Sequence, residues 1–471
     1  MYKIYSPKTL SSVLRLVGRS SVRCGSLVAA LLTSSVSYSL SADDFEFSGF
    51  GTVGMVMSDS DIYGYRRDLS FDKGVFSDDV DFSAISNLGL QLDSFVSKKS
   101  QVTLQVLLRD QTNTDIEEYI TQAFYKYSIS PSFDVREGRL PLALFALTEY
   151  REVNFAYPWA MTPTEAYGLF PLRALDGGDL SYTFRFDSSQ LQMSLFAGKT
   201  ETDVAAFENV ETIKFKNALG VSLAWSDLTW EVRGNYFQLE FDTTSSSVQL
   251  LMDGINGLAG AINATGQLLP NPPYPEELWV GAGADAEALD INGARIDYMA
   301  LSSRYYWGGW SLTGEVTRTD SPNILVPEVI GSYLSLAYAA GQSTFYGLVA
   351  NTDSDAETFD DSGVSPLVYD PNSPLLDSSV VGPVVAGAFT ILQPGYNALV
   401  DGYNQYLGFY ASSQTSYSIG WRYDLKENVA INFQYSYTVI DEGGGTLWLS
   451  ELGTTQGENV NTLFCNLSFT F

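Results

Sequence analysis

The sequence contains no histidine among its 471 residues. This absence removes the Ser-His and His-Asp arrangements in which an imidazole acts as general base. It also removes the usual nitrogen ligand of zinc. The acidic cluster within residues 353–361 lacks the glycine and the ligand spacing of a calcium loop. We therefore expect no catalytic residue, no metal site and no cofactor, and we interpret the cluster as a solvated outer loop or a loose site for divalent ions shared with lipopolysaccharide.

Cations and long apolar runs are also scarce. Lys and Arg together number 26, against 55 Asp and Glu. So acidic a chain argues against nucleic acid as a partner, because phosphates would be repelled. Beyond the N-terminal leader no segment reaches the run of about 18 apolar residues that a membrane-spanning helix needs, which excludes a helical membrane protein.

The first 41 residues carry five cations and no acid, and they contain the short apolar run LVAALL (27–32) and a small-residue stretch ending at Ser41. This order is typical of a secretory signal peptide, so we predict that residues 1–41 are removed. Cys24 precedes the apolar run, whereas the cysteine of a lipoprotein signal follows it. Cys465 is then the only cysteine of the mature chain, which excludes an intrachain disulfide.

The rest of the chain repeats a unit of about ten alternating apolar and polar residues, a short turn, and about ten more. In VAINFQYSYTV (429–439), for example, Val429, Ile431 and Phe433 alternate with polar residues. Short turns are predicted at SKKS (97–100), SPS (130–132), DSSQ (187–190), SD (226–227), GG (308–309), GQ (341–342) and KEN (426–428). Short turns that alternate with long polar loops are typical of a transmembrane β-barrel.

These seven hairpins supply fourteen strands, and two further strands lack a turn partner: FEFSGFGTVGMVMS (45–58) and the C-terminal strand. An open sheet edge in lipid would leave backbone groups unpaired, so these two strands must pair with each other. We therefore predict an all-β fold in residues 42–471, a closed antiparallel transmembrane β-barrel of 16 strands.

The last strand, VNTLFCNLSFTF, places Leu463, Leu467 and Phe471 on one face. A strand that ends on a terminal Phe, with a second aromatic residue two positions earlier, resembles the C-terminal assembly signal of Gram-negative outer-membrane barrels. The resemblance implies location in the cell outer membrane and recognition of Phe471 by the barrel-assembly machinery. It also implies contact with outer-membrane lipid and lipopolysaccharide.

Residues 141–176, between the fifth and sixth expected strands, form a long loop that contains the apolar stretch FAYPWAMTPTEAYG (155–168). Prolines and aromatic residues hold one shape at low entropic cost, which suits a loop packed inside the barrel. We predict that this third outer loop folds into the lumen as a constriction. Its expected anchors are Tyr157, Pro158, Trp159, Pro163 and Tyr167. The alternative is a cap over the mouth of the barrel.

The same region resembles a family of Gram-negative outer-membrane porins. The family pattern runs from Gly-Arg-Leu through Tyr-Pro-Trp and Pro-x-Glu-x-Tyr to Asp-Gly. It matches Gly138, Arg139, Leu140, Tyr157, Pro158, Trp159, Pro163, Glu165, Tyr167, Asp176 and Gly177. The resemblance implies a passive pore, and porins of this kind are usually homotrimers.

Strand parity predicts which charges face the pore. The inward cations are Arg109, Lys126, Arg136, Arg185, Arg233 and Arg422, and the loop carries Glu149, Glu152 and Glu165. Opposed in this way, the two sets would create a transverse field across the constriction. The charges at the constriction almost balance, so the acidic mouth of the barrel decides the ion preference. We therefore expect a modest preference for cations that weakens as salt rises.

The sequence thus favours passive diffusion of small hydrophilic solutes and ions through a water-filled pore. Ladders of inward aromatics or a dense cluster of cations would mark a substrate-selective channel. The sequence shows neither feature clearly, so a substrate-selective channel remains the alternative. The long outer loops 242–290 and 353–403 contain apolar stretches, which leaves a role as a surface adhesin or receptor as a further alternative.

Overall fold

The structure is a computed structural model that describes residues 44–147, 149–169, 171–206, 209–242, 249–250, 253–254, 257, 291–323, 326–355, 411–451 and 454–471. The predicted signal peptide of residues 1–41 lies outside the described residues, as do most of the long loops 242–290 and 353–403. The predicted strands and the loop at residues 141–176 lie almost wholly within them.

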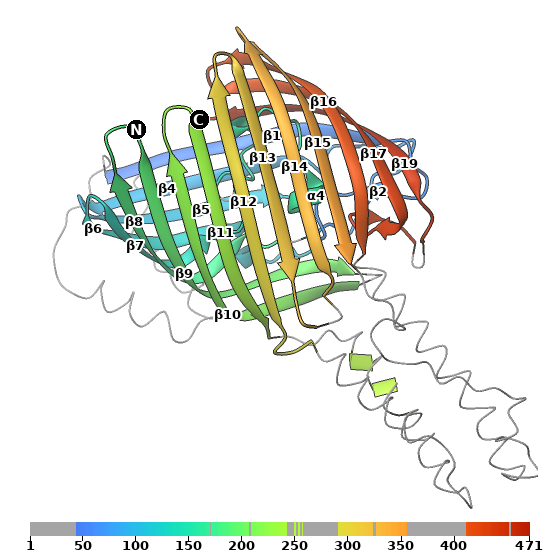
Figure 1. Ribbon diagram of the computed structural model, residues 1–471, viewed down its shortest axis with the longest axis horizontal. Helices are drawn as coiled ribbons and strands as arrows, with labels where there is room; N and C mark the ends of the chain where they lie inside the picture. The colour runs from blue at the N-terminus through green and yellow to red at the C-terminus, as the bar shows by residue number, and fades with distance from the viewer. Residues whose placement is uncertain are drawn as a thin grey trace, which may run out of the picture. The chain divides into compact units, whose positions relative to one another are not determined.

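Sixteen long antiparallel strands form one closed sheet in this part of the chain (Figure 1). They are β1 (Phe45–Ser58), β4 (Asn87–Ser97), β5 (Ser100–Arg109), β6 (Ile120–Ser130), β7 (Phe133–Pro141), β8 (Ala174–Arg185), β9 (Gln190–Ala206), β10 (Asn209–Ser226), β11 (Trp230–Phe241), β12 (Arg295–Trp307), β13 (Trp310–Asp320), β14 (Glu328–Ala340), β15 (Ser343–Asp355), β16 (Ser412–Lys426), β17 (Val429–Gly445) and β19 (Glu458–Thr470). Each pairs with the next, and β1 pairs with both β4 and β19, which closes the ring. The predicted strand count, the seven hairpins and the closure by the first and last strands are confirmed.

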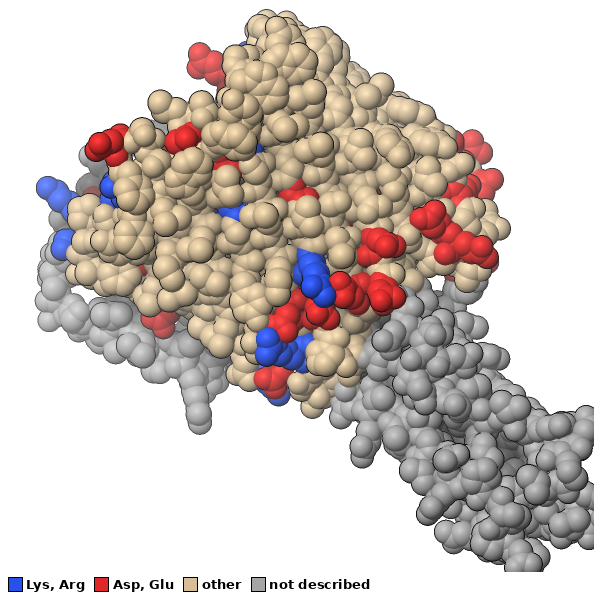
Figure 2. Space-filling view, viewed as in Figure 1, with Lys and Arg blue, Asp and Glu red and all other residues tan. Residues whose placement is uncertain are grey.

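The two faces of the sheet differ as alternation requires. On β17, Phe433 and Tyr435 are 43% and 42% exposed, whereas Asn432 and Gln434 between and beside them are 0% and 5% exposed. On the side seen in Figure 2, most of the surface carries no charged residue, and the charged side chains gather in a few groups. An apolar outer face around a polar interior is the arrangement of an outer-membrane barrel, whose outward residues contact lipid.

Shorter elements lie between the long strands. They are β2 (Gly64–Tyr65), β3 (Val80–Asp81), β18 (Trp448–Leu449), α3 (Ile116–Tyr119), α4 (Thr164–Tyr167) and the 3-10 helix η2 (Asn154–Ala156). β3 pairs with the end of β1, and β2 pairs with β18. Among the described residues, no helix has both the length and the apolar composition needed to cross a membrane.

Three outer loops meet in an apolar core on the inner side of the barrel. Segments 60–86, 157–169 and 446–449 contribute to it. Its buried members include Tyr63, Tyr65, Phe71, Ala160, Met161, Leu447 and Trp448, packed against Val56, Ile440, Val460 and Phe464 of β1, β17 and β19. Tyr65 meets the rings of Trp448 and Phe464 edge-on, at centroid distances of 5.9 and 5.0 Å. The loops at 60–86 and 446–449 were not expected at this position from the sequence.

Candidate functional site

The third outer loop, residues 142–173, joins β7 to β8, whose ends pair at Pro141 and Ala174. The loop crosses to other strands, and Figure 1 places α4 within the ring of strands. The carbonyl of Leu144 accepts a hydrogen bond from Asn235 of β11 at 2.9 Å. The N–H of Ala146 donates to a carboxylate oxygen of β13 at 2.8 Å. The loop therefore contacts inward-facing side chains well beyond its own hairpin.

Trp159 is the largest fully buried side chain of this loop, at 1% exposure. Its indole N–H donates to the hydroxyl of Ser335 on β14 at 2.8 Å. The ring of Tyr333 stands edge-on to it with centroids 5.4 Å apart, and the ring of Tyr157 lies tilted to it with centroids 5.6 Å apart. A buried indole with a satisfied N–H and aromatic neighbours is a strong local anchor.

The backbone after Trp159 is held by side chains of the wall. The N–H of Ala160 donates to the Tyr346 hydroxyl at 3.0 Å and its carbonyl accepts from the Asn466 amide at 2.7 Å. Gln434 also accepts from this N–H, at 3.2 Å. These partners lie on β15, β17 and β19. Polar inward residues thus satisfy backbone groups of the loop that would otherwise be buried without partners.

Arg422 of β16 holds the preceding turn. Its Nη1 donates to the carbonyls of Phe155 and Tyr157 at 2.7 and 2.9 Å, and its guanidinium lies 4.5 Å from the ring centroid of Phe155. Burial raises the pKa of Tyr157 well above its ordinary value, and its hydroxyl bonds to Asn154 at 2.8 Å. Arg422 was predicted to line the pore, and the structure places it against the loop.

Pro163 precedes α4, and its carbonyl accepts from the N–H of Tyr167 at 3.2 Å. The Tyr167 hydroxyl donates to Glu315 of β13, and burial raises the pKa of this tyrosine well above its ordinary value, with Glu315 adding to the shift. Glu165 is 4% exposed and accepts hydrogen bonds from Gln414 at 2.7 Å and from a serine of β16. We therefore assign Glu165 to the anchoring of the loop and not to the pore lining.

Two of the wall cations predicted from parity have partners on adjacent strands. Arg136 of β7 makes a forked contact with Asp179 of β8, with nitrogen–oxygen distances from 2.5 to 3.1 Å. Lys126 of β6 lies 3.1 Å from a carboxylate oxygen of Asp134. Each pair places opposite charges side by side on the inner face, so neither cation stands alone opposite the loop.

The other predicted charges lie at different places. Arg185 donates to the Ser132 hydroxyl at 2.7 Å and to the Pro131 carbonyl at 3.0 Å, at the short turn between β6 and β7. Arg233 is half-buried on β11. Glu149 is exposed at the near end of the loop. Of these three charges, Arg185 lies away from the loop, whereas Glu149 is within electrostatic range of Arg136, and Arg233 is within electrostatic range of Glu315.

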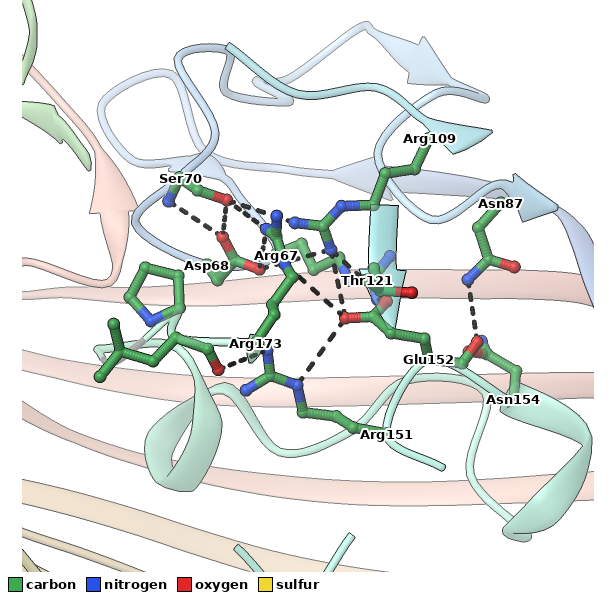
Figure 3. A network of polar contacts seen from close by, with 12 residues as sticks. Arg67, Asp68, Ser70, Asn87, Arg109, Thr121, Arg151, Glu152, Asn154 and Arg173 are labelled. Carbon is green, nitrogen blue, oxygen red and sulfur yellow. Dashed lines mark hydrogen bonds and ion pairs between the residues drawn. The ribbon is translucent and has the colours of Figure 1, made fainter. Parts of the chain in front are cut away.

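A cluster of charged side chains forms where the first and third outer loops meet β5 (Figure 3). We call it the arginine cluster; it consists of Arg67, Asp68, Arg109, Arg151, Glu152 and Arg173. Glu152 lies at its centre. It pairs with Arg67, lies 3.3 Å from Arg109, and lies 3.8 and 4.0 Å from Arg151 and Arg173. Of these residues only Arg109 and Glu152 were singled out from the sequence.

The cluster keeps its acids ionised. Burial alone would raise the pKa of Glu152, but Arg67 and Arg109 outweigh it, so the pKa lies below its ordinary value. The pKa of Asp68 is lowered in the same way, because Arg109 and Arg67 outweigh the effect of burial. Both acids therefore stay charged at neutral pH. The formal charge of the cluster is then the number of its arginines minus the number of its acids.

The motif residues at the base of the loop have a structural role. Gly138 has a φ of 130°, and a side chain there would meet the backbone of β6. Arg139 pairs with Asp176 at 2.8 and 3.0 Å and donates to the Glu117 carbonyl at 2.9 Å. Leu140 is fully buried. These residues tie β7, β8 and the segment before β6 together below the loop.

No protein-family model matches the chain, and no curated protein matches it. Some solved structures resemble the chain at low identity. OmpF of Salmonella typhi, in complex with daunomycin, is 9% identical over 91% of this chain and 97% of its own, with a TM-score of 0.46. OprB of Pseudomonas putida is 12% identical over 91% and 94%, with a TM-score of 0.45. A loop L8 deletion mutant of the outer-membrane protein OmpT of Vibrio cholerae is 9% identical over 91% and 100%, also with a TM-score of 0.45.

The closed sheet has an apolar outer face and a polar inner face that binds a long loop. The chain is a closed transmembrane β-barrel of the outer-membrane type. At these TM-scores and identities the likeness to solved structures carries no argument about this chain. What this barrel does has to be argued from its own residues.

Proposed function

We propose that the protein is a passive outer-membrane channel for small hydrophilic solutes and ions, narrowed by its third outer loop. The observation that carries this proposal is the hydrogen bonding of Trp159 and Ala160 to inward residues of β14, β15, β17 and β19. A loop held in this way reduces the open cross-section and leaves polar side chains to line what remains. We propose no catalytic role.

A substrate-selective channel is the second candidate. It is favoured by the arginine cluster, since a dense group of cations is one of the features expected of such channels. The adhesin or receptor alternative depends on loops 242–290 and 353–403, most of which lies outside the described residues. We also propose, from the resemblance to porins, a homotrimer in contact with lipid and lipopolysaccharide, assembled by the barrel-assembly machinery through Phe471.

The purified protein should produce discrete conductance steps in a planar lipid bilayer. For general diffusion the step size should rise in proportion to bulk salt, because ions cross without a saturable site. For a selective channel the conductance should saturate, and the preferred solute should reduce the salt current. Absence of steps from protein that retains heat-modifiable gel mobility, and is therefore folded, would overturn the proposal of an open channel.

The pair between Arg136 and Asp179 offers a test of ion preference. Arg136→Ala removes the cation and leaves the Asp179 carboxylate on the inner face, so the reversal potential under a salt gradient should shift toward cations. The double variant Arg136→Ala/Asp179→Asn removes both charges and should restore the wild-type value. A shift toward anions in the single variant would contradict the assignment of this pair to the pore lining.

A further inference from the structure

An acidic side chain faces outward from the barrel wall at Glu137 of β7. The neighbouring Arg136 points inward, where it pairs with Asp179, so alternation along the strand directs Glu137 to the outer face. Its cross-strand neighbours on that face are Tyr125 of β6 and Gly178 of β8. Glu137 is exposed, and it has no ion pair or hydrogen bond with any residue that the structure describes. The carboxylate therefore lacks a partner within the described part of the chain.

Glu137 interrupts the apolar band of the outer wall. On β17 the outward residues are apolar or aromatic from Ile431 to Val439. On β7 only Phe133 and Val135 precede Glu137 on the outward face. A carboxylate within the hydrocarbon region is costly unless a cation or a hydrogen-bond donor reaches it. We therefore expect a partner that brings positive charge to the outer face at this position.

Arg139, the next outward residue of β7, is already engaged and does not supply this charge. It pairs with Asp176 of β8 at 2.8 and 3.0 Å. This pair lies on the side of the outer loops, whereas Val135 lies on the side of the short turn between β6 and β7. Along the strand, Glu137 therefore has polar surface on one side and apolar surface on the other.

The outer wall is hollowed beside Glu137. We call this hollow the outer depression; it has a volume of about 720 Å³ and extends across β7 to β11. Its floor contains Gly178 and Ala197, which pair with each other across β8 and β9. A Cβ at Gly178 would meet a single backbone oxygen within 4 Å, at 3.2 Å, so the absence of a side chain there leaves open space. Exposed apolar side chains flank the floor, namely Leu180, Leu195 and Leu219.

We propose that the outer depression binds one phospholipid with a primary-amine headgroup. The ammonium group carries a positive charge and three N–H donors, and it forms charge-assisted hydrogen bonds with Glu137. One acyl chain lies over Gly178 and Ala197 and runs toward the short turn, because the apolar surface is on that side. Lipid is the medium at this face of the barrel, so a molecule that combines a cation with an apolar chain is available there. The site does not depend on what passes through the pore.

Native mass spectrometry of the folded protein in detergent micelles tests the proposal. The probes are phosphatidylethanolamine, phosphatidylcholine and phosphatidylglycerol with the same acyl chains; choline is a cation without N–H donors, and the glycerol headgroup carries no cation. Phosphatidylethanolamine should be retained about tenfold more than phosphatidylcholine, as expected for one hydrogen bond to a charged group, and phosphatidylglycerol least. Glu137→Leu should bring the ratio of the first two lipids close to one. Glu328→Leu is the matched control, since it removes an outward carboxylate that already pairs with Arg318, and it should keep the wild-type ratio.

Ala197→Leu fills the outer depression without changing its charge and should lower the retention of all three lipids. Heat-modifiable gel mobility shows that each variant is folded. Equal retention of phosphatidylethanolamine and phosphatidylcholine by the wild type, a wild-type ratio in Glu137→Leu, or unchanged retention in Ala197→Leu would overturn the site. A second copy of the chain is the other source of a cation. In that case Glu137→Leu would dissociate an oligomer in detergent and the wild type would show no headgroup preference, which also rejects the lipid site.

Discussion

Deletion of residues 150–168 should raise the single-channel conductance markedly while the barrel still assembles. The deleted segment contains η2, α4 and the turn at Trp159, which supply the contacts of the loop with β14 to β17 and β19. Pro141 and Ala174 are paired neighbours at the base of the loop. The remaining residues Leu144 and Ala146 can still reach β11 and β13, but the segment that reaches β14 to β17 and β19 is gone, and the cross-section freed there becomes available to ions.

Single-channel recording in a planar bilayer measures this effect, and heat-modifiable gel mobility shows that the variant is folded. A deletion within residues 321–327, the outer loop that joins the neighbouring strands β13 and β14, is the control for shortening an outer loop. It should leave the conductance near the wild-type value. Unchanged conductance in a folded 150–168 deletion would mean that the third outer loop caps the mouth and does not narrow the pore.

The barrel could be predicted from the sequence because its determinants are local. Alternation along a strand such as Val429–Gly445 identifies the two faces, and short turns such as 341–342 set the register of each hairpin. The long-range pairing that closes the barrel, between β1 and β19, follows from the requirement that no edge remains open in lipid. Each step uses neighbouring residues or a general rule about the membrane.

The packing of the outer loops could not be predicted in the same way. Tyr63 and Trp448 belong to the same apolar core although almost the whole barrel separates them in sequence. Closely spaced aromatics and arginines in DIYGYRRDLSF (61–71) were an available signal that this loop is not simply solvated. No periodicity links that segment to residues 446–449, so only the fold brings them together.

Charged residues show where parity stops being informative. Parity assigned Arg136 to the inner face, but it did not identify Asp179 as its forked partner across the β7–β8 ladder. Parity also gives no information on depth along the barrel. It therefore could not predict that Arg185 lies at the short turn and not beside the loop. Glu165 lies in a loop, where parity does not apply, and the short helix α4 directs it toward β16.

Trp159→Ala should destabilise the docked loop more than any other single substitution in it. Removing a fully buried indole costs about 3–5 kcal/mol, because apolar contacts are lost and a cavity is left behind. Because every 1.4 kcal/mol is a tenfold change in an equilibrium, undocking of the loop should become at least about a hundredfold more frequent. In single-channel records this should appear as excursions to a higher conductance, like that expected for the 150–168 deletion.

Trp159→Phe is the matched variant. It retains an aromatic ring against Tyr333 but loses the N–H that donates to Ser335. The loss of one hydrogen bond costs about 1 kcal/mol, so the excursions should be far rarer than in Trp159→Ala. Steady wild-type conductance from a folded Trp159→Ala channel would show that the polar contacts at Ala160, Glu165 and Tyr167 suffice to hold the loop. The same extent of undocking in both variants would place the stabilisation in the hydrogen bond to Ser335 and not in the packed ring.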